Sequence, residues 1–306
     1  MLQQPSVSVI IATYNRARYL AQTINSVLSQ RFRSFELIVV DDGSTDNTRE
    51  LLHSYADRLR FFYQENRGPS AARNLGVHHA RGEWIAIQDS DDLCRPNHLE
   101  VLFRYVAAHP DCRMVFANGA YLDRPEHGRD TIIPAGKSRR LARAGVTIQD
   151  LFERSIVRLQ GSLIARSAYD EIGGHDESLR ICMDLDLSFR LFMKFPVDYI
   201  DETVFQYRKH DGNTGRNEDL RLMENIRVIE KLVKHYPATR KLLGEQKLAR
   251  RIAYRYYRLA KGRRNRGHYR DALQAIEKAV SLYPLSVKYW FYKFQWRITE
   301  ARIEMQ

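Results

Sequence analysis

The feature that most constrains the fold is a regular alternation of two patterns over residues 6–118. Short apolar runs rich in β-branched residues, typical of buried strands, alternate with segments whose apolar residues recur at helical spacing. Between the first two runs, Leu20, Ile24 and Val27 predict a helix that returns the chain parallel. The sequence therefore predicts an α/β fold with a mostly parallel sheet. The predicted strands are residues 7–12, 35–40, 84–88 and 114–117.

After these strands the pattern changes twice. Residues 131–143 are rich in glycine, proline and basic side chains and show little periodicity, so we expect a mobile surface segment. Two further strands are predicted over residues 161–165 and 197–207, with a helix over residues 183–194 between them.

From residue 218 onward the pattern is helical almost without interruption. We therefore expect an α/β domain over residues 1–217 and an all-α extension over residues 218–306. Residues 267–284 resemble one helical hairpin of a tetratricopeptide repeat. Because such repeats need about three copies to be stable alone, we expect this one to pack on the preceding helices.

The formal net charge of +12 resides in the C-terminal part of the sequence. Residues 240–306 hold 17 Lys and Arg against 5 Asp and Glu, so the first 239 residues sum to zero. Any anionic surface that this protein meets is therefore expected to meet the C-terminal part.

The composition predicts a globular cytoplasmic protein. Residues 1–6 lack the charged and apolar segments of a secretion signal, and no apolar run approaches the ~18 residues of a membrane span. The three cysteines, Cys94, Cys112 and Cys182, lie far apart without paired spacing. They predict reduced structural residues rather than a zinc site or disulfides.

Three aspartates follow the predicted strand 84–88. Asp89, Asp91 and Asp92, with Ser90 among them, place several carboxylates where the strand ends. A hard cation such as Mg²⁺ or Mn²⁺ would relieve their repulsion and bridge to a diphosphate. The alternative is an acidic helix N-terminus, which the helix dipole favours.

Four blocks in this order resemble family 2 glycosyltransferases of the GT-A fold, and the likeness covers about residues 6–212. The blocks are residues 9–15 (VIIATYN), 39–44 (VVDDGS), 71–74 (AARN) and 89–92 (DSDD). The resemblance implies a Rossmann-like, mostly parallel sheet with flanking helices. It also implies a nucleotide-diphosphate sugar as donor, a UDP-sugar in first place, with Mn²⁺ or Mg²⁺ and inversion at the anomeric carbon. The implied setting is the assembly of cell-surface polysaccharide or glycolipid.

The resemblance also implies roles for individual residues. Thr13, Tyr14, Asn15 and Ser90 are expected to line the nucleotide pocket, where Asp42 would accept a hydrogen bond from a ring nitrogen of the nucleobase. Arg73 would hold the nucleotide and Asp89 the ribose. Asp91, with Asp92, would bind the metal. Carboxylates accept hydrogen bonds and arginine donates a planar fork, so these roles suit the residue types. Simpler alternatives are a strand-ending turn at residues 13–15, a capping role for Asp42 and a surface salt bridge for Arg73.

Inverting transfer needs a base that removes the proton of the acceptor hydroxyl. Residues 173–187 resemble the family stretch that carries this base at the start of a helix, and the matching position is Asp184. The family commonly has glutamate before this aspartate, whereas Met183 stands here, which bears on acceptor contacts and on the pKa of Asp184. Asp186 is the rival, although two positions further along a helix it should face elsewhere. Its alternative role is a solvated or capping charge.

The last predicted strand is followed by a basic loop that contains His210. This loop resembles the family loop whose histidine approaches the metal or the diphosphate, which makes His210 a candidate metal ligand. Arg208 and Lys209 are candidates to stabilise the charge of the leaving group. A surface histidine is the alternative.

The segment 288–297 interleaves aromatic residues with cations, a composition suited to the membrane interface. It predicts peripheral contact with an anionic membrane at its inner face, where a lipid-linked acceptor would be delivered. A glycan is the other acceptor class. The alternative for this segment is packing on the rest of the protein.

Two other functions compete. A sugar nucleotidyltransferase would open with a glycine-rich phosphate loop, whereas the first strand here ends in residues 13–16 (TYNR). A polyanion-binding or RNA-binding protein could use residues 250–270, with bases stacked on Tyr254, Tyr256 and Tyr257. Because the first 239 residues are neutral and carry an acidic loop, no nucleic acid partner is expected.

Overall fold

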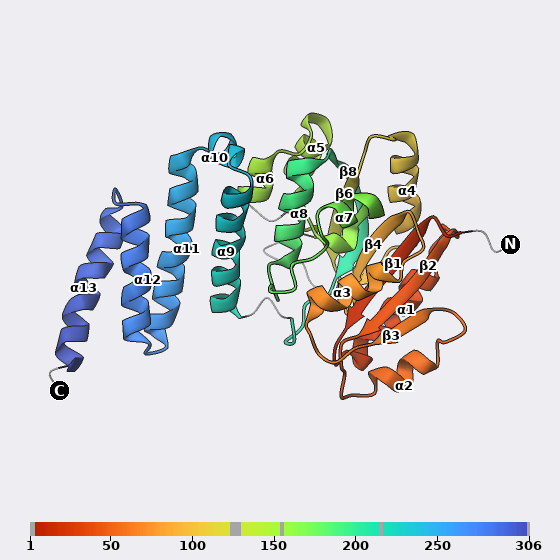
Figure 1. Ribbon diagram of the computed structural model, residues 1–306, viewed down its shortest axis with the longest axis horizontal. Helices are drawn as coiled ribbons and strands as arrows, with labels where there is room; N and C mark the ends of the chain where they lie inside the picture. Colours follow the sequence, from red (N-terminus) through yellow and green to blue (C-terminus); the bar gives the residue numbers. More distant parts are fainter. Residues whose placement is uncertain (1–3, 123–129, 154–155, 214–216, 305–306) are drawn as a thin grey trace. The chain divides into compact units, whose positions relative to one another are not determined.

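The computed structural model describes residues 4–122, 130–153, 156–213 and 217–304, with side chains described up to residue 297. The chain divides into two compact units (Figure 1): an N-terminal unit, Met1–Gly212, and a C-terminal unit, Asn213–Gln306. The sequence placed the boundary at residue 217, and residues 214–216 lie outside the described part of the chain.

The N-terminal unit is built on one sheet of eight strands in the order β3-β2-β1-β4-β7-β6-β8-β5. Six strands run parallel, whereas β5 and β7 pair antiparallel with their neighbours. This arrangement confirms the predicted mostly parallel α/β fold. The strands are β1 Val7–Thr13, β2 Phe35–Asp41, β3 Arg60–Tyr63, β4 Trp84–Asp89, β5 Leu93–Cys94, β6 Met114–Tyr121, β7 Ser162–Ala165 and β8 Val197–Tyr207.

Eight α-helices of the described residues belong to this unit and lie around the sheet (Figure 1). The predicted crossover between the first two strands is α1, which buries Leu20, Ile24 and Val27. The helices are α1 Ala17–Leu28, α2 Thr48–His53, α3 Pro69–His78, α4 His98–Ala108, α5 Ala135–Ala144, α6 Ile148–Glu153, α7 Arg166–Glu171 and α8 Met183–Lys194.

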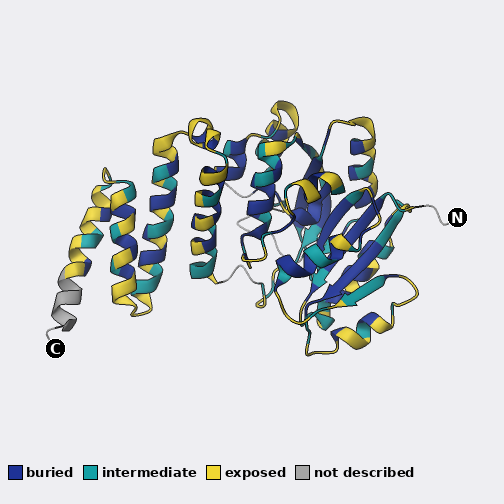
Figure 2. Ribbon diagram, viewed as in Figure 1, coloured by how far each residue is buried: buried dark blue, intermediate teal, exposed yellow. Residues whose placement is uncertain are grey.

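The central strands are buried along almost their whole length, as Figure 2 shows. In β1, both Ile10 and Ile11 are fully buried although they point to opposite faces of the sheet. This is the pattern of a parallel sheet covered on both faces. It explains why the apolar runs in the sequence are continuous rather than alternating.

The prediction of an irregular surface segment over residues 131–143 is wrong for most of its length. Helix α5 occupies residues 135–144 and buries Ser138 and Leu141. The Ser138 hydroxyl hydrogen-bonds with the Tyr199 hydroxyl and the Asp201 carboxylate of β8. Only two of its ten residues are buried, so the segment offers few apolar residues from which a helix could be recognised.

A buried polar chain joins the end of β4 to the start of α4. The Cys94 thiol donates to Gln88 Oε1 at 3.0 Å, and His98 Nδ1 lies 3.1 Å from the Cys94 sulfur. Burial raises the pKa of Cys94 and lowers the pKa of His98 to about 4, so both groups are neutral at neutral pH. All three cysteines are free and buried.

His98 should make the fold sensitive to acid. Because burial lowers its pKa only in the folded chain, His98 binds a proton near pH 6.5 in the unfolded chain but stays unprotonated there in the folded chain. The contribution of His98 to the free energy of unfolding should therefore be complete above about pH 6.5. Between about pH 6.5 and about pH 5, the free energy of unfolding should fall by about 2 kcal/mol from this residue alone. His98→Asn should lack this part of the decline in urea unfolding measured at both pH values. An identical decline in both proteins would contradict the explanation, since the buried His175 is unchanged in each.

The C-terminal unit consists of helices with a core of their own. Helices α11 and α12 form a hairpin whose turn contains Gly267 at a φ of 83°, a left-handed conformation that suits glycine. Tyr257 of α11, Ile276 of α12 and Trp296 of α13 contribute to the buried cluster. The helices are α9 Glu218–His235, α10 Ala238–Leu243, α11 Glu245–Asn265, α12 Tyr269–Leu282 and α13 Val287–Glu304. None of the helices in the described ranges is both long and apolar enough to cross a membrane.

Candidate active site

The register of the parallel strands brings the predicted site residues to one edge of the sheet. Thr13 at the end of β1 lies opposite Asp41 at the end of β2, and Ala12 lies opposite Asp89 at the end of β4. Strand β8 runs in the same direction and ends at Tyr207, so the loop that follows it lies at the same edge. In open α/β sheets this edge is where ligands bind.

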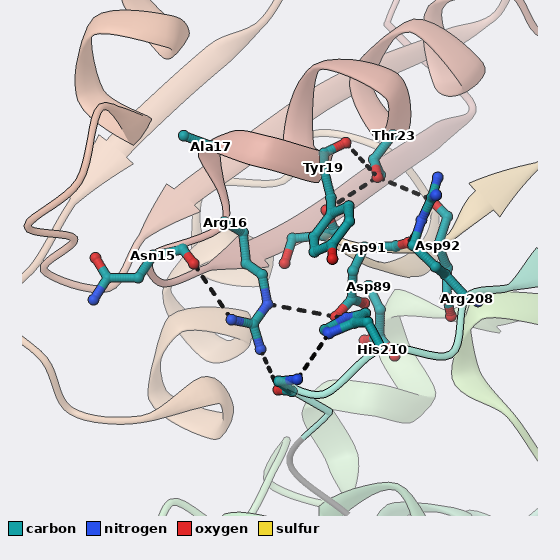
Figure 3. A network of polar contacts seen from close by, with 12 residues as sticks. Asn15, Arg16, Ala17, Tyr19, Thr23, Asp89, Asp91, Asp92, Arg208 and His210 are labelled. Carbon is teal, nitrogen blue, oxygen red and sulfur yellow. Dashed lines mark hydrogen bonds and ion pairs between the residues drawn. The ribbon is translucent and has the colours of Figure 1, made fainter.

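Asp91 is the centre of a small charged cluster, drawn in Figure 3. Its Oδ2 atom lies 2.9 Å from His210 Nε2 and 3.5 Å from Arg16 Nε. The His210 ring stacks on Tyr19 with the ring centroids 4.7 Å apart. Arg16 also donates to the carbonyl of Gly212 at 2.7 Å, which ties the loop after β1 to the loop after β8.

The donor atoms at Asp91 fit a metal that is shared with a substrate. Within the described ranges, no group of three or more His, Cys, Asp and Glu side chains could hold a metal ion. Mg²⁺ and similar ions are, however, commonly held by one or two protein ligands together with substrate phosphates. The Asp91 carboxylate and the His210 imidazole nitrogen form such a pair, and the remaining positions would fall to water and phosphate oxygens.

Arg73 joins the two ends of the site. Its Nη1 donates to Asp184 Oδ1 at 2.9 Å and its Nη2 donates to Asp89 Oδ1 at 2.6 Å, while only 6% of the residue is exposed. Burial acts to lower the pKa of Arg73, but the carboxylates of Asp184 and Asp89 outweigh it and the pKa is raised. The guanidinium therefore stays charged and fixes the distance between the two carboxylates.

The surroundings of Asp89 disfavour its ionised form. Burial is the main cause that raises its pKa, to about 6, and repulsion from Asp184 and Asp91 adds to it against the attraction of Arg73. A further acidic residue, Asp92, is fully buried, and burial raises its pKa as well. Burial and the neighbouring carboxylates thus both disfavour the ionised forms of Asp89 and Asp92.

Asp184 is the second residue of α8, and its side chain is 23% exposed beside Arg73. The preceding Met183 is buried, and the Ser70 hydroxyl of α3 lies 3.4 Å from its sulfur. Asp186, the rival for the role of base, is also buried and pairs with Arg190 at 2.6 Å within the same helix. It is therefore neither a solvated charge nor part of the cluster around Asp91.

The two adjacent aspartates at the end of β2 have different surroundings. Asp42 accepts three hydrogen bonds, from Gln64 Nε2 at 2.6 Å and from the backbone N–H groups of Arg67 and Gly68 at 2.9 Å each. Asp41 accepts one hydrogen bond at Oδ1, while its buried Oδ2 has no partner among the described residues. Thr13 Oγ1, from the facing strand position, is also buried without a described partner.

Unpaired buried acceptors are costly, and they point to a ligand that would satisfy them. Asp41 is not among the site residues that the sequence motifs predicted. The available signal was strand register, since Asp41 continues β2 opposite Thr13 and Asp42 does not.

Two of the other predicted site residues hold loops in place. Asn15 adopts a left-handed φ of 52°, which asparagine tolerates, and its Oδ1 accepts from the Thr45 N–H at 2.7 Å. Asp92 accepts from the Arg208 N–H at 2.8 Å and from Gln160 Nε2 at 2.7 Å, so both of its carboxylate oxygens are in use.

The remaining predicted residues differ in how they are presented. Ser90 is buried, and its carbonyl accepts from the Thr23 hydroxyl at 3.0 Å. Tyr14 exposes 44% of its surface, and Lys209 is exposed. Arg208 donates from Nε to the Asp91 carbonyl at 3.0 Å. Of these side chains, Tyr14 is the aromatic one, and its ring is partly accessible.

Comparison with solved structures shows which fold class this protein has. Staphylococcus aureus TarS in complex with UDP-GlcNAc superposes with a TM-score of 0.64 at 18% identity, covering 90% of this chain and 81% of that chain. The mannosyltransferase PcManGT of Pyrobaculum calidifontis, in complex with GDP-Man and Mn²⁺, superposes with a TM-score of 0.61 at 19% identity, covering 97% and 85%. These similarities, with the sheet described above, define a GT-A fold with a C-terminal helical extension.

Sequence relatives narrow the class further. The sequence model of the family described as Glycosyl transferase family 2 matches residues 8–171. An uncharacterized glycosyltransferase of Rickettsia typhi is 32% identical over 213 residues, which cover 69% of this chain and 66% of that protein. For a Rickettsia conorii relative, at 30% identity, the match covers 67% of this chain and 34% of that protein. The chain thus spans about two thirds of the first of these curated relatives and about a third of the second.

This chain belongs to glycosyltransferase family 2. The family and the fold that the sequence motifs predicted are therefore confirmed.

Proposed function

We propose that this protein transfers a sugar from a nucleotide-diphosphate sugar to an acceptor hydroxyl with inversion at the anomeric carbon. The observation that carries the proposal is the arrangement around Arg73. One buried guanidinium links Asp89, two residues from the candidate metal ligand Asp91, to the candidate base Asp184. The proposed donor-binding groups and the proposed base would thereby be held at one edge of the sheet, as transfer between two bound substrates requires.

The donor half of the site divides into a nucleobase end and a phosphate end. At the nucleobase end, the exposed Tyr14 ring would stack on the nucleobase, and Thr13 with Asp41 would accept hydrogen bonds from its N–H groups. Asp89 would hold the ribose hydroxyls. Asp42 and Asn15 would act by holding the loops around this pocket.

At the phosphate end, Asp91 and His210 would hold Mn²⁺ or Mg²⁺ together with the diphosphate. Asp92, predicted as a further ligand, would instead fix the turn that carries Asp91, because both of its oxygens are hydrogen-bonded. When bound, the metal would supply positive charge that stabilises the departing nucleoside diphosphate. PcManGT is a relative by fold whose complex contains both GDP-Man and Mn²⁺.

At the acceptor half, Asp184 would take the proton of the acceptor hydroxyl as its oxygen attacks the anomeric carbon. The bond between that carbon and the diphosphate oxygen breaks on the opposite side, and the nucleoside diphosphate leaves with the electron pair. Arg73, already bound to Asp184 Oδ1, would keep the carboxylate oriented before the attack.

The roles of the two adjacent aspartates can be separated by substitution. Asp41→Asn should weaken nucleotide binding by about tenfold to a hundredfold, because a hydrogen bond to a charged group is lost. Asp42→Asn should instead lower the melting temperature, since the amide NH2 would replace one of two accepting oxygens and face a backbone N–H donor. Calorimetry with the nucleotide and thermal melts of both variants measure this. If Asp41→Asn bound the nucleotide as tightly as the wild type and only Asp42→Asn lost affinity for it, Asp42 would be the residue that recognises the nucleobase.

For the acceptor we propose a glycan or a lipid-linked glycan, in the assembly of cell-surface polysaccharide or glycolipid. The protein would act in the cytoplasm, held peripherally at the inner face of the membrane. Support for the membrane comes from the strongly basic C-terminal unit, whose residues 240–306 carry the whole net charge of +12.

A screen of nucleotide sugars with and without Mn²⁺, read as release of nucleoside diphosphate, tests the proposed function. We expect Mn²⁺-dependent release from one or a few donors, slow without an acceptor. UDP-sugars stand first because a fold relative was solved with UDP-GlcNAc. No release from any donor with any acceptor class would contradict the proposal.

A further inference from the structure

Helix α13 has two apolar faces, and the protein's own core uses one of them. Tyr289 and Trp296 are buried in the core of the C-terminal unit, where Tyr289 stacks on Tyr257 with the ring centroids 5.3 Å apart. Val287, Trp290, Phe291 and Phe294 occupy the opposite face, which we call the outer face of α13. Their positions follow the spacing i, i+3, i+4, i+7, so they form one stripe along the helix.

The outer face is open to solvent (Figure 2). Val287 is 82% exposed, Phe291 62% and Phe294 71%, and Trp290 is about half exposed. Leu285, just before the helix, is also largely exposed. A helix that only sealed a core would be expected to carry polar residues on its outer face. A run of large apolar side chains there indicates a surface that something covers.

Cations lie on both sides of this face. Lys288 follows Val287 and extends over the Tyr257 ring, 4.4 Å from its centroid. On the other side, Lys293 lies over Trp290, 5.2 Å from its ring centroid, and Arg297 pairs with Glu277 of α12. An apolar stripe that contains tryptophan and is flanked by lysine and arginine is the composition of a helix lying in a membrane interface.

We propose that the outer face of α13 inserts into the interfacial layer of a membrane that contains anionic lipid. Its apolar side chains would enter the acyl boundary while the flanking cations stay among the headgroups. Charge complementarity favours lipid over a second copy of this chain, because two copies would bring together segments of residues 240–306 that each carry +12. The inference deepens the membrane association proposed above and is independent of sugar transfer.

The test is sedimentation of the full chain with vesicles at about 0.15 M salt, comparing phosphatidylcholine alone with a mixture containing about 30% phosphatidylglycerol. We expect binding to the anionic vesicles and little to the neutral ones. The double variant Phe291→Gln, Phe294→Gln should lower the apparent affinity at least about tenfold, because two inserted rings are lost. Leu242→Gln, a half-exposed apolar residue of α10, is the matched control and should bind as the wild type does.

Insertion has a separate optical readout. Lipids brominated along their tails should quench tryptophan fluorescence of the full chain. Trp290→Phe should remove most of this quenching, because Trp296 is buried in the core and Trp84 lies at the start of β4 in the N-terminal unit. The absence of wild-type binding to anionic vesicles, or equal binding by the double variant, would overturn the proposal. So would a dimer in sedimentation velocity that the double variant abolishes while no vesicles are bound, since the face would then be a subunit interface.

The same variants separate this proposal from the proposed activity. Release of nucleoside diphosphate by the double variant, measured in solution without an acceptor, should match the wild type. Vesicle binding needs no donor, so either result can fail without the other.

Discussion

Asp184→Asn is expected to lower the turnover of sugar transfer by about a hundredfold to ten-thousandfold, the usual range for loss of a general base. Nucleoside diphosphate should still bind with Mn²⁺ as tightly as to the wild type. The reason is geometric: asparagine can keep an oxygen near Arg73 Nη1, 2.9 Å away, so the bridge to Asp89 survives while the basic group is gone. Turnover from product release and affinity from calorimetry are the two measurements.

Asp186→Asn is the matched control, because it lies in the same helix and carries the same chemical change. Asp186 pairs with Arg190 and is buried, so the variant should melt at a lower temperature while each folded molecule keeps near wild-type turnover. Loss of the calorimetric signal in Asp184→Asn would contradict the role of base. Loss of turnover only in Asp186→Asn would move that role to Asp186.

Asp91→Ala should abolish the part of donor binding that depends on metal. Its carboxylate is the acidic group that lies beside His210, and alanine leaves one nitrogen ligand in place of a pair. We expect the affinity for nucleoside diphosphate with Mn²⁺ to fall to the value that the wild type shows with a chelator, a loss of at least about a hundredfold. Calorimetry with and without Mn²⁺ measures this difference directly.

His210→Ala is expected to lose part of the same affinity, because Asp91 can still take part alone. An Asp91→Ala protein that kept the full enhancement by Mn²⁺ would show that the metal, if one is used, binds elsewhere. Because Arg16 also contacts Asp91, Arg16→Gln serves as a control that removes a neighbouring charge without removing a candidate ligand.

The sequence predicted the central strands closely, for a physical reason. In β1, β2 and β4 most positions on both faces are buried, so their sequences are largely apolar, and the predicted strands end one residue before the observed ones. Strand β3 was missed because its four residues, Arg60–Tyr63, are only partly buried and include no β-branched residue. Helix α5 was missed because only two of its ten residues are buried, which leaves few apolar residues to mark it.

The candidate site was predictable as a set of motifs but not as a set of contacts. Motif matching could place Asp91 and His210 in the same site, although 119 residues separate them. It could not show that Arg73 joins Asp89 to Asp184, since that bridge depends on how α3 and α8 pack. It assigned the nucleobase to Asp42 without access to the register of β1 and β2, in which Asp41 lies opposite Thr13. The individual roles of these residues remain predictions.

The central claim is that Asp91 holds a divalent ion that neutralises the diphosphate of the donor. A crystal of the protein soaked with Mn²⁺ and the nucleoside diphosphate identified by the screen tests it most directly. We expect anomalous density for manganese about 2.1 Å from an Asp91 oxygen and in contact with a phosphate oxygen. A nucleotide bound at this edge of the sheet, with no metal density and with Asp91 still paired to His210 and Arg16, would contradict it.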